Sequence, residues 1–283
     1  MKLYALNSGY FKLDGGAMFG VVPKSLWHRQ QPADENNMCS WAMRCLLIEK
    51  GNQLILIDTG IGNKQDDKFF GHYYLHGNDS LIGHLNRLGF NPADVTDVVL
   101  THLHFDHCGG AIERNDQGQL QPAFKNARFW SHQSHWQWAT KPNAREKASF
   151  LSENILPIQE SGQLNLLESL SFRFEVPELG LEFFLVNGHT EAQMLPIVKY
   201  QDKTLVFMAD LMPSSVHVPL PYVMGYDVRP LLTMEEKSQI LKEAAENNYI
   251  LLLEHDPKFE ACTVQMSERG PRLLHTGNLT DFL

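Results

Sequence analysis

Cysteine, basic charge and long apolar runs are all scarce in this sequence of 283 residues. The four cysteines include no C-x-x-C pair, which argues against a disulfide framework or a cysteine zinc cage and predicts reduced thiols. Lysine and arginine total 24 against 33 acidic residues, and the resulting charge of −9 disfavours nucleic acid and anionic membranes as partners. No stretch approaches the roughly 18 apolar residues of a membrane helix, and the amino terminus is too polar for a secretory signal. We therefore expect a soluble, cytoplasmic protein without membrane spans.

The sequence also lacks internal repeats and any linker rich in proline, glycine or serine, which favours one domain over two tethered ones. Short β-rich runs at 44–49 and 53–58, joined by a turn at 50–52, predict a hairpin. Further elements are expected as strands at 97–100, 181–186, 204–209 and 249–253, and as a short helix at 131–139. The prediction is a single domain over residues 1–283, of the α/β (α+β) class with a layered sheet core.

Two further helices are predicted from their start signals. Apolar residues recur at helical spacing over 81–88, with Asn78 or Asp79 as the expected N-cap. Later in the chain, Thr233-x-x-Glu236 matches a capping box and predicts a helix beginning there.

Histidine is abundant, with 13 copies, and several of them stand close together. The segment T-H-L-H-F-D-H at 101–107 places four ligand-type residues directly after a predicted buried strand, as a metal centre on a rigid strand end requires. His102 and His104 are two residues apart, so in extended backbone their rings point the same way and can bind one ion. Asp106 and His107 lie past the expected bend and can face a second ion.

Three other predicted strands end in residues of the same kind. G-H-T at 188–190 follows one strand, Asp210 ends the next, and Glu254-His255-Asp256 ends the last. Histidines and aspartates packed together repel one another's protons unless a cation is present. A metal site is therefore the expected use of these residues.

The motif T-H-L-H-F-D-H-x-G-G, preceded by I-D-T-G and followed by G-H-T, a strand-terminal aspartate and a late histidine, resembles the metallo-β-lactamase superfamily over about residues 45–255. The resemblance implies a four-layer αββα sandwich with two divalent metal ions, zinc before manganese, iron or cobalt. The implied ligands are His102, His104 and His189 for the first metal, Asp106, His107 and His255 for the second, and Asp210 as the bridge. Asp58 is implied to orient ligands.

Residues 13–24 (LDGGAMFGVVPK), with the motif at 101–110, are similar to quorum-quenching N-acyl homoserine lactonases and related organophosphate-cleaving enzymes. Many such lactonases have a tyrosine three residues past the bridging aspartate, where this sequence has Pro213. A phenol that stabilises the leaving oxygen would then come from elsewhere, such as Tyr222 or Tyr226. The resemblance also implies a homodimer.

The chemistry expected of such a centre needs no serine or cysteine nucleophile. Two divalent ions about 3.5–4 Å apart share a bridging hydroxide that attacks an electrophilic carbonyl or phosphoryl group. Asp106 or Asp210 then passes the proton to the leaving alkoxide, so both are candidate catalytic residues. The candidate pocket residues for a small ester or lactone are Phe19, Trp27, Phe69, Phe70, His217, Tyr222 and Tyr226.

The leading hypothesis is thus a dinuclear metal hydrolase that opens lactones of the N-acyl homoserine lactone type. An organophosphate or aryl-ester hydrolase with the same centre is the alternative, and an iron-dependent redox enzyme on the same scaffold is a more remote one. A glutathione thioesterase is disfavoured because the sequence shows no carboxy-terminal basic cluster, and a nuclease is disfavoured by the acidic charge. A non-catalytic metal-stabilised module would not be expected to keep every ligand.

Overall fold

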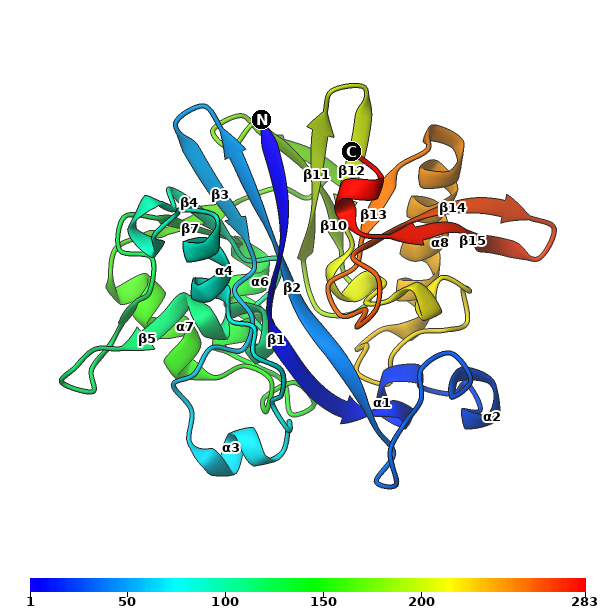
Figure 1. Ribbon diagram of the computed structural model, residues 1–283, viewed down its shortest axis with the longest axis horizontal. Coiled ribbons are helices and arrows are strands. Elements are labelled where there is room, and N and C mark those ends of the chain that lie inside the picture. The colour runs from blue at the N-terminus through cyan, green and yellow to red at the C-terminus, as the bar shows by residue number, and fades with distance from the viewer. The chain divides into compact units, whose positions relative to one another are not determined.

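The computed structural model describes all 283 residues, which form two compact units (Figure 1). The first unit comprises Met1–Gly9, Met43–Ser171 and Glu191–Met194. The second comprises Tyr10–Ala42, Phe172–Thr190 and Leu195–Leu283. No helix combines the length and the apolar sequence needed to span a membrane. All four cysteines are buried thiols without a disulfide.

A six-stranded mixed sheet is centred on the first unit. Its strands, in spatial order, are β1 (Lys2–Asp14), β2 (Met38–Lys50), β3 (Gln53–Ile57), β4 (Asp97–Val99), β7 (Arg128–His132) and β8 (Leu164–Leu167). β2 and β3 form the predicted hairpin with antiparallel pairing, while β3, β4, β7 and β8 are paired in parallel. The central strands are almost wholly apolar because both of their faces are buried.

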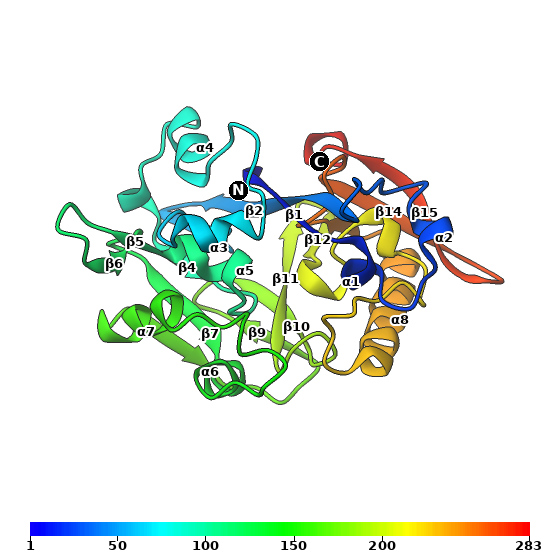
Figure 2. The same ribbon diagram turned by 90° about the horizontal axis from the view of Figure 1, so that it is seen from below.

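Helices and a small ribbon complete the first unit. They are α3 (Asp67–Gly71), α4 (Leu81–Arg87), α5 (Phe105–Cys108), α6 (Gln133–Thr140), α7 (Ser152–Glu160), the 3-10 turns η1 (Pro92–Asp94) and η2 (Gly109–Ala111), and the ribbon β5 (Ile112–Arg114) with β6 (Leu120–Pro122). α6 lies beside β7 and also contacts β8 (Figure 2). Apolar residues such as Leu85, Val98 and Phe129 form the core. The predicted N-cap of α4 is wrong, because the Ser80 hydroxyl accepts from the Gly83 amide while the Asp79 carboxylate contacts His84.

A seven-stranded mixed sheet is centred on the second unit. Its order is β15 (Gly270–Gly277), β14 (Ala261–Ser267), β13 (Ile250–Leu252), β12 (Lys203–Phe207), β11 (Gln193–Tyr200), β10 (Leu181–Val186) and β9 (Arg173–Val176). β12 and β13 pair in parallel. The pairs β9 with β10, β11 with β12, β13 with β14, and β14 with β15 are antiparallel. The strands predicted at 181–186, 204–209 and 249–253 are confirmed as β10, β12 and β13.

The second unit has one long helix, α8 (Pro230–Asn247), which lies against β14 (Figure 2). Its shorter turns are α1 (Gly15–Phe19), α2 (Lys24–Trp27), η3 (Ala209–Leu211), η4 (Ser215–His217) and η5 (Leu279–Asp281). The predicted capping box is wrong, since α8 begins at Pro230 and the Glu236 carboxylate instead accepts from the amides of Asn187 and Gly188 at 2.7 and 2.9 Å. Proline suits this first helical position because its missing N–H has no intrahelical acceptor there.

Candidate metal centre

The first unit carries a cluster of four ligand-type side chains after β4. His102 and His104 lie in extended backbone, and α5 then carries Asp106 and His107 past the bend, as the sequence predicts. All four side chains are buried. The ligand atoms of His102 and His104 lie within 4.8 Å of each other, and so do those of Asp106 and His107.

Two glycines allow the chain to turn back tightly behind this cluster. A Cβ atom on Gly109 would lie 2.2 Å from the Ile61 carbonyl oxygen, and one on Gly110 would lie 2.3 Å from the Thr59 carbonyl oxygen. The Gly110 amide donates to the Gly60 carbonyl at 2.9 Å across this approach. Only glycine fits at these two positions, so the ligand segment is pressed against the end of β3.

Asp58 contacts this cluster directly. Its buried carboxylate accepts from the Thr101 amide at 2.8 Å, from the Thr101 hydroxyl at 2.6 Å and from His107 Nδ1 at 3.1 Å. Because a carboxylate only accepts, His107 carries its proton on Nδ1 and keeps Nε2 for another bond. The Thr101 hydroxyl, which donates to Asp58, lies 3.1 Å from His102 Nδ1 and accepts from it. Asp58 therefore orients one histidine directly and a second through Thr101.

The second unit carries the other cluster, in which one carboxylate faces two histidines. Asp210 lies in η3, with Oδ2 at 3.1 Å from His189 Nε2 and Oδ1 at 3.0 Å from His255 Nε2. His189 donates from Nδ1 to Asp227 at 2.9 Å, and His255 donates from Nδ1 to the Ala42 carbonyl at 2.7 Å. Each histidine thus has its Nε2 directed at a different oxygen of the same carboxylate.

The surroundings of His189 favour positive charge. Burial lowers the pKa of His189, but the facing carboxylates of Asp210 and Asp227 outweigh burial and raise its pKa to about 10. A group that holds its proton so strongly marks a place where a cation is stabilised. Buried imidazole and carboxylate donors are the set that suits zinc, manganese, iron or cobalt. The residues of both clusters therefore fit divalent metal ions.

The loop before His189 is fixed by helix α8. Glu236 of α8 accepts from both amides that precede His189, and a Cβ atom on Gly188 would lie 2.3 Å from the Thr233 amide nitrogen. Burial raises the pKa of Glu236 to about 7, against the lowering effect of the two amides. The glycine of G-H-T is therefore required by the close approach of the helix.

The sequence profile of a family described as "Metallo-beta-lactamase superfamily" matches residues 44–255. The chain belongs to the metallo-beta-lactamase superfamily. A crystal structure of a probable metal-dependent hydrolase of this kind from Staphylococcus aureus is 30% identical, with a TM-score of 0.86 over 98% of this chain and 96% of that one. An N-acyl homoserine lactonase from Bacillus thuringiensis is 28% identical over 277 residues, which are 93% of this chain and 96% of the relative.

More distant structures share the metallo-beta-lactamase fold. AidC, described as a dizinc quorum-quenching lactonase and solved with a product, is 20% identical with a TM-score of 0.78, covering 96% of this chain and 93% of its own. AbOPH, a hydrolase of the same superfamily, is 21% identical with a TM-score of 0.74, covering 96% and 94%. The predicted fold class is confirmed, with two mixed sheets and flanking helices. Together with the two His/Asp clusters, these findings identify a metal-dependent hydrolase of the metallo-beta-lactamase superfamily.

The structure adds His135, in α6, to the residues that position the ligands. Its Nε2 accepts from the Leu103 amide at 2.8 Å, and its Nδ1 donates to the Glu191 carbonyl at 2.5 Å. Burial lowers the pKa of His135 to about 3, so the ring stays neutral and Nε2 can accept. His135 thereby holds the backbone between His102 and His104. The sequence placed this residue in a helix but gave no sign of its contacts.

We expect His135→Gln to reduce the free energy of unfolding by about 1–3 kcal/mol at pH 7.5, because a buried amide or carbonyl loses its partner. The wild-type chain should also lose stability in acid, since an unfolded histidine binds a proton below about pH 6.5 while folded His135 does so only near pH 3. Between about pH 6.5 and pH 3, His135 lowers the free energy of unfolding by about 1.4 kcal/mol for each pH unit of acidification. Urea unfolding of the metal-free chain at pH 7.5, 5.5 and 4.5 measures both effects.

The free energy of unfolding should fall less steeply with acidification in His135→Gln than in the wild type. Some acid dependence remains in the variant, because burial also lowers the pKa of His217 to about 3. His275→Gln on the exposed part of β15 is the matched control and should change stability by less than about 0.5 kcal/mol. An acid slope unchanged in His135→Gln would contradict the assignment of a neutral buried ring.

The predicted pocket residues fall into two groups. Phe19, Trp27 and His217 are buried in the second unit, where Phe19 stacks on Trp27 at 4.9 Å and on His217 at 4.7 Å between ring centroids. Tyr222 meets the edge of Phe19, and Tyr226 is 38% exposed. His217 donates from Nε2 to the Met18 carbonyl at 2.9 Å, and its Nδ1 accepts from the Ser214 hydroxyl at 2.7 Å. A role in substrate binding stays a prediction for each of these residues.

The other two predicted pocket residues, Phe69 and Phe70, lie in α3 of the first unit. Phe69 lines a groove of about 620 Å³ together with Lys64, Gln65, Asp66, Arg114, Phe150, Leu151, Ser152 and Glu153. Phe70 meets Phe69 edge to face at 5.6 Å. Phe150 in the groove wall also contacts the His104 ring, at 4.8 Å between centroids. The groove therefore adjoins the first ligand cluster.

Proposed function

We propose that this protein is a dinuclear hydrolase that opens the ring of N-acyl homoserine lactones or closely similar lactones. The observation that carries the proposal is the carboxylate of Asp210, which presents one oxygen to His189 Nε2 and the other to His255 Nε2. A carboxylate placed in this way is suited to bridge two metal ions. The similarity to a Bacillus thuringiensis lactonase over nearly the whole of both chains supports the choice of substrate.

Two divalent ions, proposed to be zinc, would be held by buried histidines and aspartates. His102, His104 and His189 would hold the first ion, Asp106, His107 and His255 the second, and Asp210 both. This assignment treats residues 1–283 as one catalytic domain, and the family match at 44–255, which draws on segments of both units, supports it. When bound, the ions polarise the ester carbonyl and lower the pKa of water toward neutrality.

The remaining chemistry belongs to the side chains. Asp58, Asp227 and the Ala42 carbonyl accept the Nδ1 protons of His107, His189 and His255, so Nε2 would be the unprotonated, metal-binding nitrogen of each ring when metal is bound. Either Asp106 or Asp210 is proposed to carry the proton to the leaving alkoxide oxygen. Pro213 replaces the tyrosine of many lactonases, so any phenol at the leaving oxygen is proposed to be that of Tyr222 or Tyr226.

The acyl chain of the substrate is proposed to lie in the groove of the first unit. Phe69, Phe150 and Leu151 supply apolar wall, and Phe150 joins the groove to the His104 ring. The volume of about 620 Å³ is within the usual range for small-molecule sites. The polar residues that line the groove, among them Lys64 and Gln65, are proposed to face the amide and ring oxygens of the substrate rather than its acyl chain.

Metal removal and return tests this function. Purified protein should contain about two equivalents of zinc, and a pH-indicator assay should show lactone opening that chelation abolishes and zinc restores. The loss is expected because the site would keep no group able to activate water at neutral pH. Two bound metals without lactone turnover would overturn the lactonase proposal and favour phosphotriester or aryl-ester substrates, and bound iron with oxygen consumption would favour redox chemistry.

A further inference from the structure

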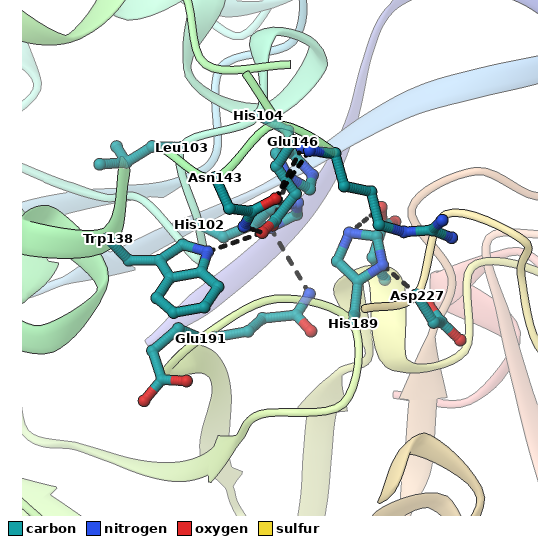
Figure 3. Close-up of polar contacts among 12 residues, drawn as sticks. His102, Leu103, His104, Trp138, Asn143, Glu146, His189, Glu191 and Asp227 are labelled. Atoms are coloured by element: carbon teal, nitrogen blue, oxygen red, sulfur yellow. Dashed lines mark hydrogen bonds and ion pairs between the residues drawn. The ribbon is translucent and has the colours of Figure 1, made fainter. Parts of the chain in front are cut away.

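A buried carboxylate that the proposed ligand set does not include lies beside the first cluster. Glu146 lies in the loop between α6 and α7 and is 4% exposed. Figure 3 shows its side chain beside those of His104, Trp138 and Asn143. Its Oε2 accepts from Trp138 Nε1 at 2.7 Å and from Asn143 Nδ2 at 2.5 Å, and its Oε1 lies 3.5 Å from His104 Nε2. A buried carboxylate is costly unless it is paired and hydrogen-bonded, so its place here calls for a role.

The other histidines of the two clusters share one orientation. His102, His107, His189 and His255 each direct Nδ1 to a neighbouring acceptor, namely Thr101, Asp58, Asp227 and the Ala42 carbonyl. His104 is the exception, because its Nε2 is the nitrogen that faces a carboxylate. With Nε2 facing the carboxylate, Nδ1 of His104 would be the metal ligand.

We propose that Glu146 is the positioning residue for His104, which accepts the Nε2 proton and so selects Nδ1 as the ligand atom. The inference rests on the proposed metal centre and deepens it. Trp138 and Asn143 hold the carboxylate from one side, and Phe150 contacts the His104 ring at 4.8 Å. The ring is thus fixed both in rotation and in the position of its proton.

Glutamine does not reproduce this arrangement. Glu146 Oε2 accepts from Trp138 and Asn143, and its Oε1 faces His104 Nε2 at 3.5 Å. A glutamine offers one oxygen and an NH₂ group, so one side would set donor against donor. Glu146→Gln therefore keeps the shape of the side chain while it removes the contact that fixes the His104 proton.

The test uses the zinc-loaded chain and two readouts besides turnover. Long-range ¹⁵N–¹H spectra should place the ring proton of His104 on Nε2 and those of the other four histidines on Nδ1. In Glu146→Gln, competition with a chelator should show one zinc bound about 10–100-fold more weakly, with the second zinc changed much less. A proton on Nδ1 of His104, or zinc affinities within twofold of the wild type, would overturn the proposal.

Two further variants distinguish a specific effect on zinc binding from a general loss of folding. Trp138→Phe keeps the packing and removes one donor to Glu146, and should weaken the same zinc by a smaller factor. Glu113→Gln, on β5, is the control, because its carboxylate contacts Gln121 on β6 and should leave both affinities unchanged. A wild-type chain that binds no pair of zinc ions would contradict the proposed function, whereas two bound zinc ions with the wrong His104 proton would contradict this inference alone.

Discussion

Asp210→Asn should lower the kcat/KM for lactone opening by at least about a thousandfold, or about 4 kcal/mol of transition-state stabilisation. The amide has nearly the same shape as the carboxylate, but it lacks the negative charge and has only one acceptor oxygen for the two histidines that Asp210 faces. Steady-state assays in excess zinc measure the loss of kcat/KM. The zinc content of the same samples shows whether that loss comes with a loss of bound metal.

The control for this change is Asp202→Asn, in the exposed turn between β11 and β12, which should leave turnover and zinc content unchanged. Thermal unfolding followed by circular dichroism verifies that the Asp210 variant remains folded. Turnover within tenfold of the wild type would show that Asp210 is not part of the reacting centre.

Lys237→Met should reduce the free energy of unfolding by about 3–5 kcal/mol. Lys237 has no exposed surface, and its ammonium donates to the carbonyls of His217, Pro219 and Tyr222 at 3.0, 3.2 and 2.8 Å. Methionine fills the same volume but leaves three carbonyls of one loop without their donor. Burial lowers the pKa of Lys237 to about 7, so the unfolding measurement is best made at pH 6, where the ammonium form dominates.

Lys242→Met on the same helix is the matched control. Its side chain is exposed and lies 3.9 Å from Glu246, a pair expected to contribute less than about 0.5 kcal/mol. Urea unfolding of both variants beside the wild type measures the difference. A loss below about 1 kcal/mol in Lys237→Met would mean that the loop does not depend on Lys237, because water satisfies its carbonyls in the variant.

The ligand motif was predictable because its geometry is local. His102 and His104 follow a strand at a spacing of two, and Asp106 and His107 follow a bend that glycines allow, so six consecutive residues define most of the first cluster. The apolar strands were predictable for the same reason, since burial on both faces leaves a continuous apolar run. Asp210 was predictable as a site residue because it follows the end of a predicted apolar strand.

Apart from Asp58, which the family resemblance implied, the residues that orient the candidate ligands were not predictable in this way. Asp227 lies 38 residues from His189, His135 lies 32 residues from Leu103, and Glu146 follows a loop without a motif. Their contacts depend on how distant segments pack, which no local spacing encodes. The Thr233-x-x-Glu236 pattern misled for a related reason, because the glutamate that a capping box would use locally bonds to a loop 48 residues away.

The hydrogen bonds from the Asn187 and Gly188 amides to Glu236 make the hydrogen–deuterium exchange of these two amides depend on the opening of helix α8. Asn187 and Gly188 donate their amide hydrogens to a side chain of α8, and Thr233 of the same helix covers Gly188. These hydrogens can reach solvent deuterium only when the start of α8 moves away. The segment that carries His189 and the first turns of α8 therefore form one cooperative opening unit, so solvent should enter around this ligand at the rate at which the helix opens.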